Sequence, residues 1–140
     1  MTPLRREERM VGLVIVTQSR KLAEGIQETA GSLAGSGVRI VAAGGTKNGG
    51  FGTDIIRILE AILTADSGEG AVVVADLESS LVNCKAAVDL LDDDTRQTVK
   101  IADAPVFEGT AGAAVEASLG SSVEEVAAAA EEAALQQKFV

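Results

Sequence analysis

The sequence VGLVIVTQSR, from Val11 to Arg20, places six apolar or small residues directly ahead of three polar ones. A short continuous run rich in Val and Ile predicts a strand buried on both faces, as in a parallel sheet. Ser19 is a suitable N-cap for the amphipathic helix that we expect to follow at once. Parallel α/β sheets bind their ligands at the carboxyl ends of the strands, where the strand order reverses. Thr17, Gln18 and Ser19 are therefore the first candidates for a functional site.

The pattern of an apolar run followed by a helical stretch recurs along the whole chain. Apolar residues at helical spacing, and the turn residues between segments, set the expected boundaries. We expect strands at 11–17, 38–43, 71–75 and 97–102, and helices at 20–34, 53–63, 80–91, 111–119 and 122–137. This alternation predicts an α/β fold, a doubly wound, mainly parallel central sheet of four to five strands with helices on both faces. We expect residues 1–10 to form a flexible N-terminal extension and 11–137 a single domain.

Composition excludes several classes of protein. A chain of 140 residues with 46% hydrophobic residues can bury a core, which a disordered chain cannot. Three Phe and no Trp or Tyr leave few aromatic rings on which nucleic-acid bases could stack. The net charge of −9, without a large Lys/Arg cluster, also argues against a nucleic-acid partner.

The numbers of cysteines and histidines exclude further kinds of functional site. Cys84 is the only cysteine, which excludes an intramolecular disulfide and a multi-cysteine metal site. We interpret it as a small buried residue. The sequence has no histidine, so His-based catalytic relays, His-ligated metals and a phosphohistidine are excluded. No apolar run approaches the roughly 18 residues of a membrane span, and we expect a cytoplasmic protein.

Four loops should follow the carboxyl ends of the strands, at 17–20, 44–53, 76–80 and 102–109. The glycine-rich loop at 44–52 could bind an anion with its backbone N–H groups, or could simply connect a strand to a helix. It matches neither a P-loop nor a dinucleotide-binding fingerprint.

Asp76 ends an apolar strand, where a carboxylate is either functional, or a helix N-cap or a partner of nearby backbone N–H groups. Ser79 and Ser80 are more readily explained as caps than as nucleophiles, because no base lies beside them. Glu78 supplies a second carboxylate near Asp76, but no third ligand for Mg²⁺ is evident. We therefore expect neither a metal site nor a cofactor.

Together these loops carry a family resemblance. The segments are VGLVIVTQSRKLAEGI at 11–26, IVAAGG at 40–45, FGT at 51–53, AVVVADLESSLVNCKAAVDLL at 71–91 and APVFEGTAGAAVEAS at 104–118. With these segments in the same order, and over most of its length, the chain resembles the DhaM phosphocarrier subunits of phosphotransferase-dependent dihydroxyacetone kinases. More broadly, it is similar to the mannose-type enzyme IIA family.

The resemblance places Gln18 at the position of the family's phosphoacceptor histidine, in a segment that usually reads Ser-His-Ser. The family's Asp-Leu-Gly-Ser reads Asp76-Leu77-Glu78-Ser79 here. The amide of Gln18 is not basic and cannot act as an imidazole nucleophile. Glu78 adds a negative charge that would repel an incoming phosphoryl group by an energy on the order of kcal/mol.

The resemblance implies a carrier that takes a phosphoryl group from HPr and passes it to ADP on the DhaL subunit. Because Gln18 replaces the acceptor, we expect this chain to be inactive in phosphotransfer and to act as a binding or regulatory homologue. The implied partners are HPr, the DhaK–DhaL kinase subunits and a second copy in a homodimer. The alternative is a pocket reassigned to another small ligand. The expected pocket around residue 18 consists of Thr17, Ser19, Gly45, Gly52, Thr53, Asp76, Glu78 and Ser79.

Overall fold

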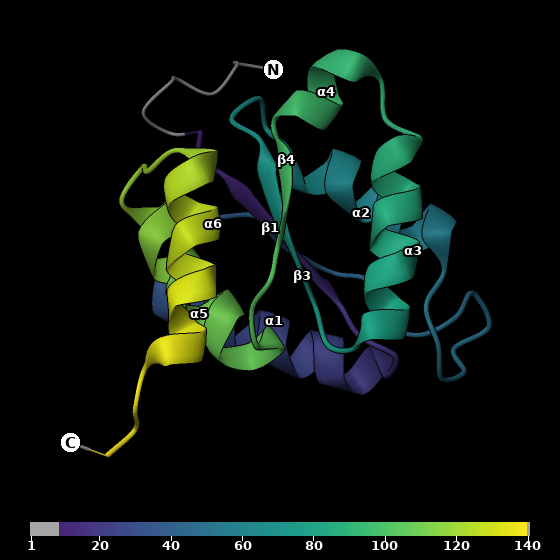
Figure 1. Cartoon of the computed structure of the whole chain (residues 1–140), viewed down its shortest axis with the longest axis horizontal. Coiled ribbons are helices and arrows are strands. Elements are labelled where there is room, and N and C mark those ends of the chain that lie inside the picture. The colour runs from purple at the N-terminus through teal and green to yellow at the C-terminus, as the bar shows by residue number, and fades with distance from the viewer. Residues whose placement is uncertain (1–8, 140) are drawn as a thin grey trace.

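The computed structural model describes residues 9–139, and they form an α/β fold (Figure 1). Strands and helices alternate along the chain as the apolar runs predict. The order is β1 (Gly12–Val16), α1 (Arg20–Ala34), β2 (Ile40–Ala42), α2 (Ile55–Ala65), β3 (Ala71–Ala75), α3 (Glu78–Asp89), α4 (Asp93–Gln97), β4 (Val99–Ala102), α5 (Val106–Ser118), α6 (Val123–Glu132) and a 3₁₀ turn η2 (Ala133–Leu135).

The sheet has the strand order β2-β1-β3-β4, and all its described pairs are parallel. Val14 of β1 lies opposite Val41 of β2 on one side and Val73 of β3 on the other. After β1 the chain adds β2 on one side of β1 and then β3 on the other side. The topological switch point therefore lies between β1 and β3. The expected α/β class and parallel sheet are confirmed.

Helices cover both faces of the sheet. α1, α5 and α6 lie against one face, and α2 and α3 against the other (Figure 1). Alternate residues of β1 divide between the two layers: Leu13 and Ile15 pack toward the first group, and Val14 and Val16 toward the second. All four side chains are fully buried. β1 is therefore buried on both faces, as its uninterrupted apolar sequence predicts.

Two boundaries of the predicted elements are wrong for identifiable reasons. The fourth strand begins at Val99 because the residues before it form α4, whose N-cap Asp92 accepts a hydrogen bond from the Thr95 N–H at 2.8 Å. The next helix begins at Val106, not at 111, and includes Gly109. A Cβ at Gly109 would lie 2.8 Å from the Ala104 Cβ, so this glycine permits close packing and does not break the helix.

Smaller shifts occur at other helix ends. α3 begins at Glu78, after Leu77 as the N-cap residue, so the expectation that Ser79 and Ser80 cap this helix is wrong. α2 begins at Ile55 instead of near 53, and the last helix ends at Glu132 before η2.

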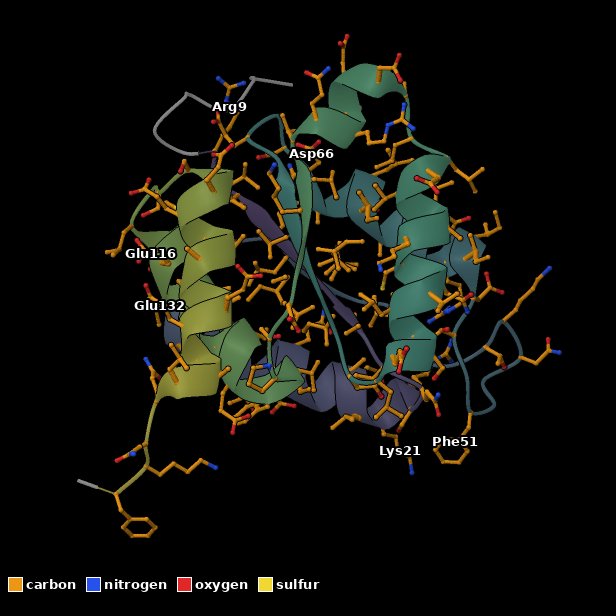
Figure 2. All side chains as sticks on the ribbon, in the orientation of Figure 1. Arg9, Lys21, Phe51, Asp66, Glu116 and Glu132 are labelled. Atoms are coloured by element: carbon orange, nitrogen blue, oxygen red, sulfur yellow. The ribbon has the colours of Figure 1, made fainter. Side chains whose placement is uncertain are left out.

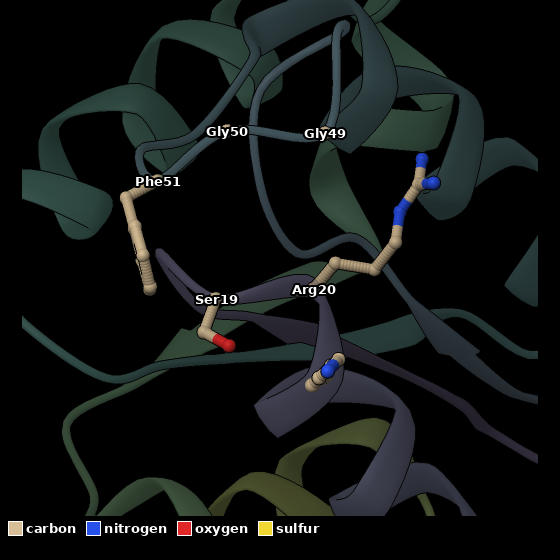
Figure 3. Close-up of a pocket in the computed structure, with 6 residues that line it drawn as sticks. Ser19, Arg20, Gly49, Gly50 and Phe51 are labelled. Carbon is tan, nitrogen blue, oxygen red and sulfur yellow. The ribbon is translucent and has the colours of Figure 1, made fainter.

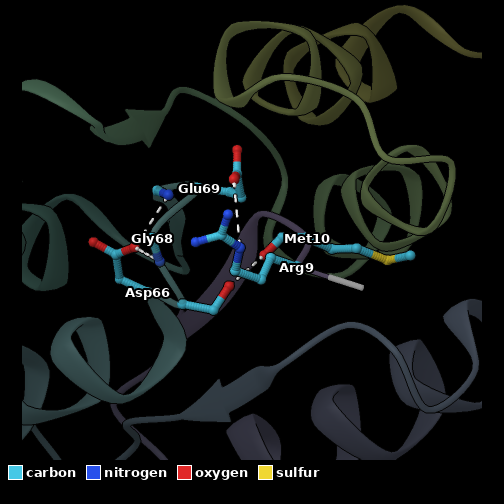
Figure 4. Close-up of polar contacts among 7 residues, drawn as sticks. Arg9, Met10, Asp66, Gly68 and Glu69 are labelled. Carbon is cyan, nitrogen blue, oxygen red and sulfur yellow. Dashed lines mark hydrogen bonds and ion pairs between the residues drawn. The ribbon is translucent and has the colours of Figure 1, made fainter. Parts of the chain in front are cut away.

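The expected N-terminal extension over 1–10 falls mostly outside the described residues. The Met10 carbonyl accepts a hydrogen bond from the Ser67 hydroxyl at 3.2 Å, and Arg9 Nε lies 4.0 Å from a Glu69 carboxylate oxygen (Figure 4). Asp66 fixes the same turn by accepting from the N–H groups of Gly68 and Gly70. Over residues 9–139, no helix has the length and apolar character needed to cross a membrane.

Candidate functional site

The carboxyl ends of β1 and β3 meet at the switch point and bring two polar loops together. The Asp76 N–H donates to the Val16 carbonyl at 3.0 Å, which continues the β1–β3 ladder to the end of both strands. Residues 17–19 and 76–80 therefore lie side by side, as expected for loops at this edge of a parallel sheet.

Asp76 is the centre of this polar cluster. Its Oδ2 accepts a hydrogen bond from the Gln18 N–H at 3.1 Å. Its Oδ1 accepts from the Leu77 N–H at 2.8 Å and from the Ser80 hydroxyl at 2.6 Å. Ser80 is fully buried and was not among the predicted site residues. Its position four residues after Asp76 is the sequence signal that could have identified it.

Gln18 is half-buried, and both its backbone and its side chain are engaged. Its side-chain Nε2 donates to the Ser79 hydroxyl at 2.7 Å. Its carbonyl accepts from the Gly52 N–H at 3.0 Å, while its own N–H donates to Asp76. The structure thus brings Gln18, Asp76, Ser79 and Gly52 together around one position.

Thr17 and Ser19 shape the turn on either side of Gln18. Thr17 is fully buried, and its hydroxyl donates to the Ser19 carbonyl at 2.5 Å. Its own carbonyl accepts from the Gly45 N–H at 3.0 Å. The Ser19 hydroxyl accepts from the Leu22 N–H at 3.2 Å, so the predicted N-cap is confirmed.

The glycine-rich loop is pressed against the start of α1. A Cβ at Gly44 would lie 2.6 Å from the Ser19 carbonyl oxygen and 2.8 Å from the Ala23 Cβ, which leaves no room for a side chain. Gly45 and Gly52 have φ values of 78° and 129°, which favour glycine. The loop is held to its neighbours by hydrogen bonds from the backbone of Gly45 and Gly52.

Thr53 and Glu78 lie at the edge of the cluster. The Thr53 hydroxyl accepts from the Asn83 side-chain amide at 2.6 Å, so it links the loop to α3 and not to Gln18. Glu78 is exposed and lines a hollow of about 220 Å³ at the ends of β3 and β4, together with Asp103 and with Asp76 of the cluster. Within residues 9–139, no three His, Cys, Asp or Glu side chains are placed to hold a metal ion.

Cys84 lies beneath the site on α3 and is fully buried, as expected. Burial, and secondly the negative charge of Asp76, raise the pKa of its thiol from 9.0 to about 12. The thiol is therefore protonated at neutral pH and is not a nucleophile.

Sequence comparison identifies the family. The profile of the EIIA-man family, described as PTS system fructose IIA component, matches residues 12–127. Two DhaM proteins, described as phosphoryl donor subunits of PEP-dependent dihydroxyacetone kinases, are each 33% identical to the chain. The match to the Listeria innocua protein covers 84% of this chain and 94% of that protein. The match to the Escherichia coli protein covers 84% of this chain but only 25% of that longer relative.

Structural comparison agrees with this assignment. The crystal structure of the unknown-function protein EF1359 superposes with a TM-score of 0.75 and 28% identity, over 87% of this chain and 94% of that one. Dihydroxyacetone kinase from C. freundii superposes with a TM-score of 0.58 and 15% identity, over 89% of this chain and 25% of the kinase, which shows a shared fold alone. From the parallel sheet, the site at its switch point and these matches together, we conclude that the chain is a DhaM-like member of the EIIA-man family of phosphotransferase-system proteins.

Proposed function

We propose that this chain takes part in phosphotransferase-dependent dihydroxyacetone phosphorylation as a binding or regulatory protein that carries no phosphoryl group itself. Relatives that cover most of the chain are named as phosphoryl donor subunits of dihydroxyacetone kinases, which supports a related role. The observation that carries the proposal is Gln18, which stands where the family resemblance places the acceptor histidine.

The contacts of Gln18 support this proposal. A glutamine amide has no basic nitrogen, and Nε2 of Gln18 already donates to the Ser79 hydroxyl. The side chain is neutral, so it resembles an unphosphorylated carrier. Exposed Glu78 adds a negative charge in the first turn of α3, next to Ser79. Both features disfavour phosphoryl transfer and leave the backbone of the site in place.

The first experiment measures phosphorylation by intact mass. The natural chain and Gln18→His are incubated with phosphoenolpyruvate, enzyme I and HPr, and Gln97→His serves as the matched control. Gln97 is exposed at the end of α4, before β4 and so at the opposite edge of the sheet. We expect a phosphoryl group on Gln18→His only. Phosphorylation of the natural chain would overturn the proposal.

A second experiment measures binding in the absence of transfer. The natural chain is added to a dihydroxyacetone kinase reaction driven by a histidine-bearing DhaM. We expect dose-dependent inhibition, because the chain competes for HPr or for the DhaK–DhaL subunits. Leu77→Asp should weaken this inhibition, since Leu77 is exposed beside the site, whereas Leu90→Asp at the far end of α3 should not. Absence of inhibition would contradict a role in this system.

We also propose that the chain forms a homodimer in the cytoplasm, as the family resemblance implies. Sedimentation equilibrium of the purified chain tests the oligomeric state, and a monomer at micromolar concentration would contradict it. If neither the natural chain nor Gln18→His is phosphorylated, and neither inhibits, the alternative of a pocket reassigned to another ligand is favoured.

A further inference from the structure

We infer that the hollow between the start of α1 and the β2–α2 loop binds a small phosphomonoester whose carbon part is planar or apolar. The inference does not rest on the proposed function. The hollow measures about 280 Å³ and is lined by Ser19, Arg20, Lys21, Gly49, Gly50 and Phe51. None of these residues belongs to the hydrogen-bonded set formed by Gln18, Asp76, Ser79 and Ser80.

The charge of this hollow contrasts with the rest of the molecule. The chain has a net charge of −9, yet residues 17–21 and 44–53 contain three cations, Arg20, Lys21 and Lys47, and no Asp or Glu. The ion pairs formed within residues 9–139 involve neither Arg20 nor Lys21. Glu24 lies one turn further along α1, four residues after Arg20 and three after Lys21, so one carboxylate lies near the two cations. Carboxylates further away than about 8 Å are screened at physiological salt, so an anion in the hollow meets two cations and one nearby carboxylate.

The helix dipole does not account for cations at this position. Arg20 and Lys21 are the first two residues of α1, where the helix dipole disfavours positive charge. The Ser19 hydroxyl caps the N–H of Leu22, and the N–H groups of Arg20 and Lys21 precede the first intrahelical hydrogen bond. A dianionic phosphate has several acceptor oxygens and would satisfy both the cations and these backbone donors.

The two walls of the hollow are fixed relative to each other. Hydrogen bonds of 3.0 Å run from the Gly45 N–H to the Thr17 carbonyl and from the Gly52 N–H to the Gln18 carbonyl. They hold both ends of the glycine-rich loop against the turn that precedes α1. The hollow is therefore formed before a ligand arrives, which lowers the entropic cost of binding.

Phe51 gives the hollow an apolar side. Its side chain is 84% exposed and points from the loop toward Ser19, while Arg20 extends toward Gly49 across the opening (Figure 3). Phe51 and Lys21 also lie at the same corner of the whole molecule (Figure 2). A ring or short apolar group on the ligand would cover this exposed aromatic side chain, and the small volume excludes a large ligand.

Calorimetric titration with phenyl phosphate, inorganic phosphate and phenol tests the inference. We expect saturable binding of phenyl phosphate that is clearly tighter than that of inorganic phosphate. The double variant Arg20→Gln/Lys21→Gln should weaken it by roughly tenfold or more, as expected for loss of charge-assisted hydrogen bonds. Phe51→Ala should reduce the affinity for phenyl phosphate to that for inorganic phosphate.

The controls separate binding from folding. Lys85→Gln removes an exposed cation on α3, outside the hollow, and should leave the affinity unchanged. The double variant removes cations from the start of α1, so its thermal stability should be unchanged or higher. Three results would overturn the inference: no saturable binding of phenyl phosphate, binding that all variants retain, or equal affinity for inorganic phosphate, which would mean an adventitious ion only.

Discussion

Replacing Asp76 with asparagine tests whether its carboxylate holds the site together. The carboxylate accepts three hydrogen bonds, two at Oδ1 and one at Oδ2. Asparagine can keep its carbonyl oxygen on the side of Leu77 and Ser80, but its NH₂ group then faces the Gln18 N–H, and two donors meet. In the opposite orientation the NH₂ group can donate to the Ser80 hydroxyl, but it faces the Leu77 N–H as a second donor, so one hydrogen bond is lost in either case.

The size of the effect follows from this geometry. Loss of one hydrogen bond to a charged group, with a partly buried N–H left unsatisfied, costs about 2–3 kcal/mol. For a domain of this length, that corresponds to a fall of roughly 7–10 °C in the midpoint of thermal unfolding. The Gln18 amide proton should also exchange with solvent faster in Asp76→Asn than in the natural chain.

Guanidinium unfolding followed by far-ultraviolet circular dichroism measures the change, because the chain has no Trp or Tyr as a fluorescent probe. Asp103→Asn is the matched control in the neighbouring loop, where the exposed residue uses its backbone N–H to donate to Glu131. Its effect should stay within about 0.5 kcal/mol. If Asp76→Asn also changed the free energy of unfolding by less than 0.5 kcal/mol, the carboxylate would not be the centre of the cluster.

Three further predictions concern packing and ionisation. Gly44→Ala should lower the free energy of unfolding by about 1–3 kcal/mol, because its Cβ meets the backbone of α1. Gly25→Ala should raise the free energy of unfolding by roughly 0.5–1 kcal/mol, because a Cβ there has nothing within 4 Å. Denaturant unfolding that changed the stability of both variants in the same direction would contradict this prediction. The thiol of Cys84 should not react with Ellman's reagent at pH 8 in the folded protein. Because folding raises its pKa from 9.0 to about 12, its contribution to stability is complete below pH 9 and is lost between pH 9 and 12; if Cys84→Ala leaves that alkaline decline unchanged, another group causes it. Hydrogen bonds from Ser122 lower the pKa of Glu125 below its ordinary 4.5, so its contribution to stability is present above pH 4.5 and is lost as the pH falls through the folded-state value. Glu125→Gln should flatten the acid limb of stability against pH, measured by circular dichroism, and an unchanged limb would argue against this contribution.

The sequence predicts the sheet well because each strand carries its own signal. The run from Val11 to Val16 is apolar without interruption, and the structure buries β1 between two helical layers. Burial on both faces follows from this pattern, since helices cover both faces of a parallel sheet. Because residues 17–19 and 76–80 each follow an apolar strand, they are expected at the edge of the sheet formed by the carboxyl ends of the strands. The structure places them there.

Local patterns fail where the reason for a residue lies elsewhere in the chain. Gly109 and the proline before its helix suggest a loop, yet Gly109 lies inside α5, because a Cβ there would meet Ala104 and the Ala130 carbonyl. That carbonyl belongs to α6, so the contact cannot be predicted from the residues that surround Gly109 in the sequence. Ser80 differs from Gly109, because its partner Asp76 lies only four residues away. Their hydrogen bond depends on where the helix starts, and α3 begins at Glu78 instead of at Ser80.

The geometry at residue 18 is largely independent of its side chain. The backbone N–H of Gln18 donates to Asp76, and its carbonyl accepts from Gly52. The residues on either side are fixed through Gly45 and through the Ser19 cap. Only the bond from Nε2 to Ser79 would change if histidine stood at this position. Exchange between glutamine and histidine therefore alters the chemistry at residue 18 while the backbone hydrogen bonds around it persist, so Gln18→His tests the acceptor without disturbing the rest of the site.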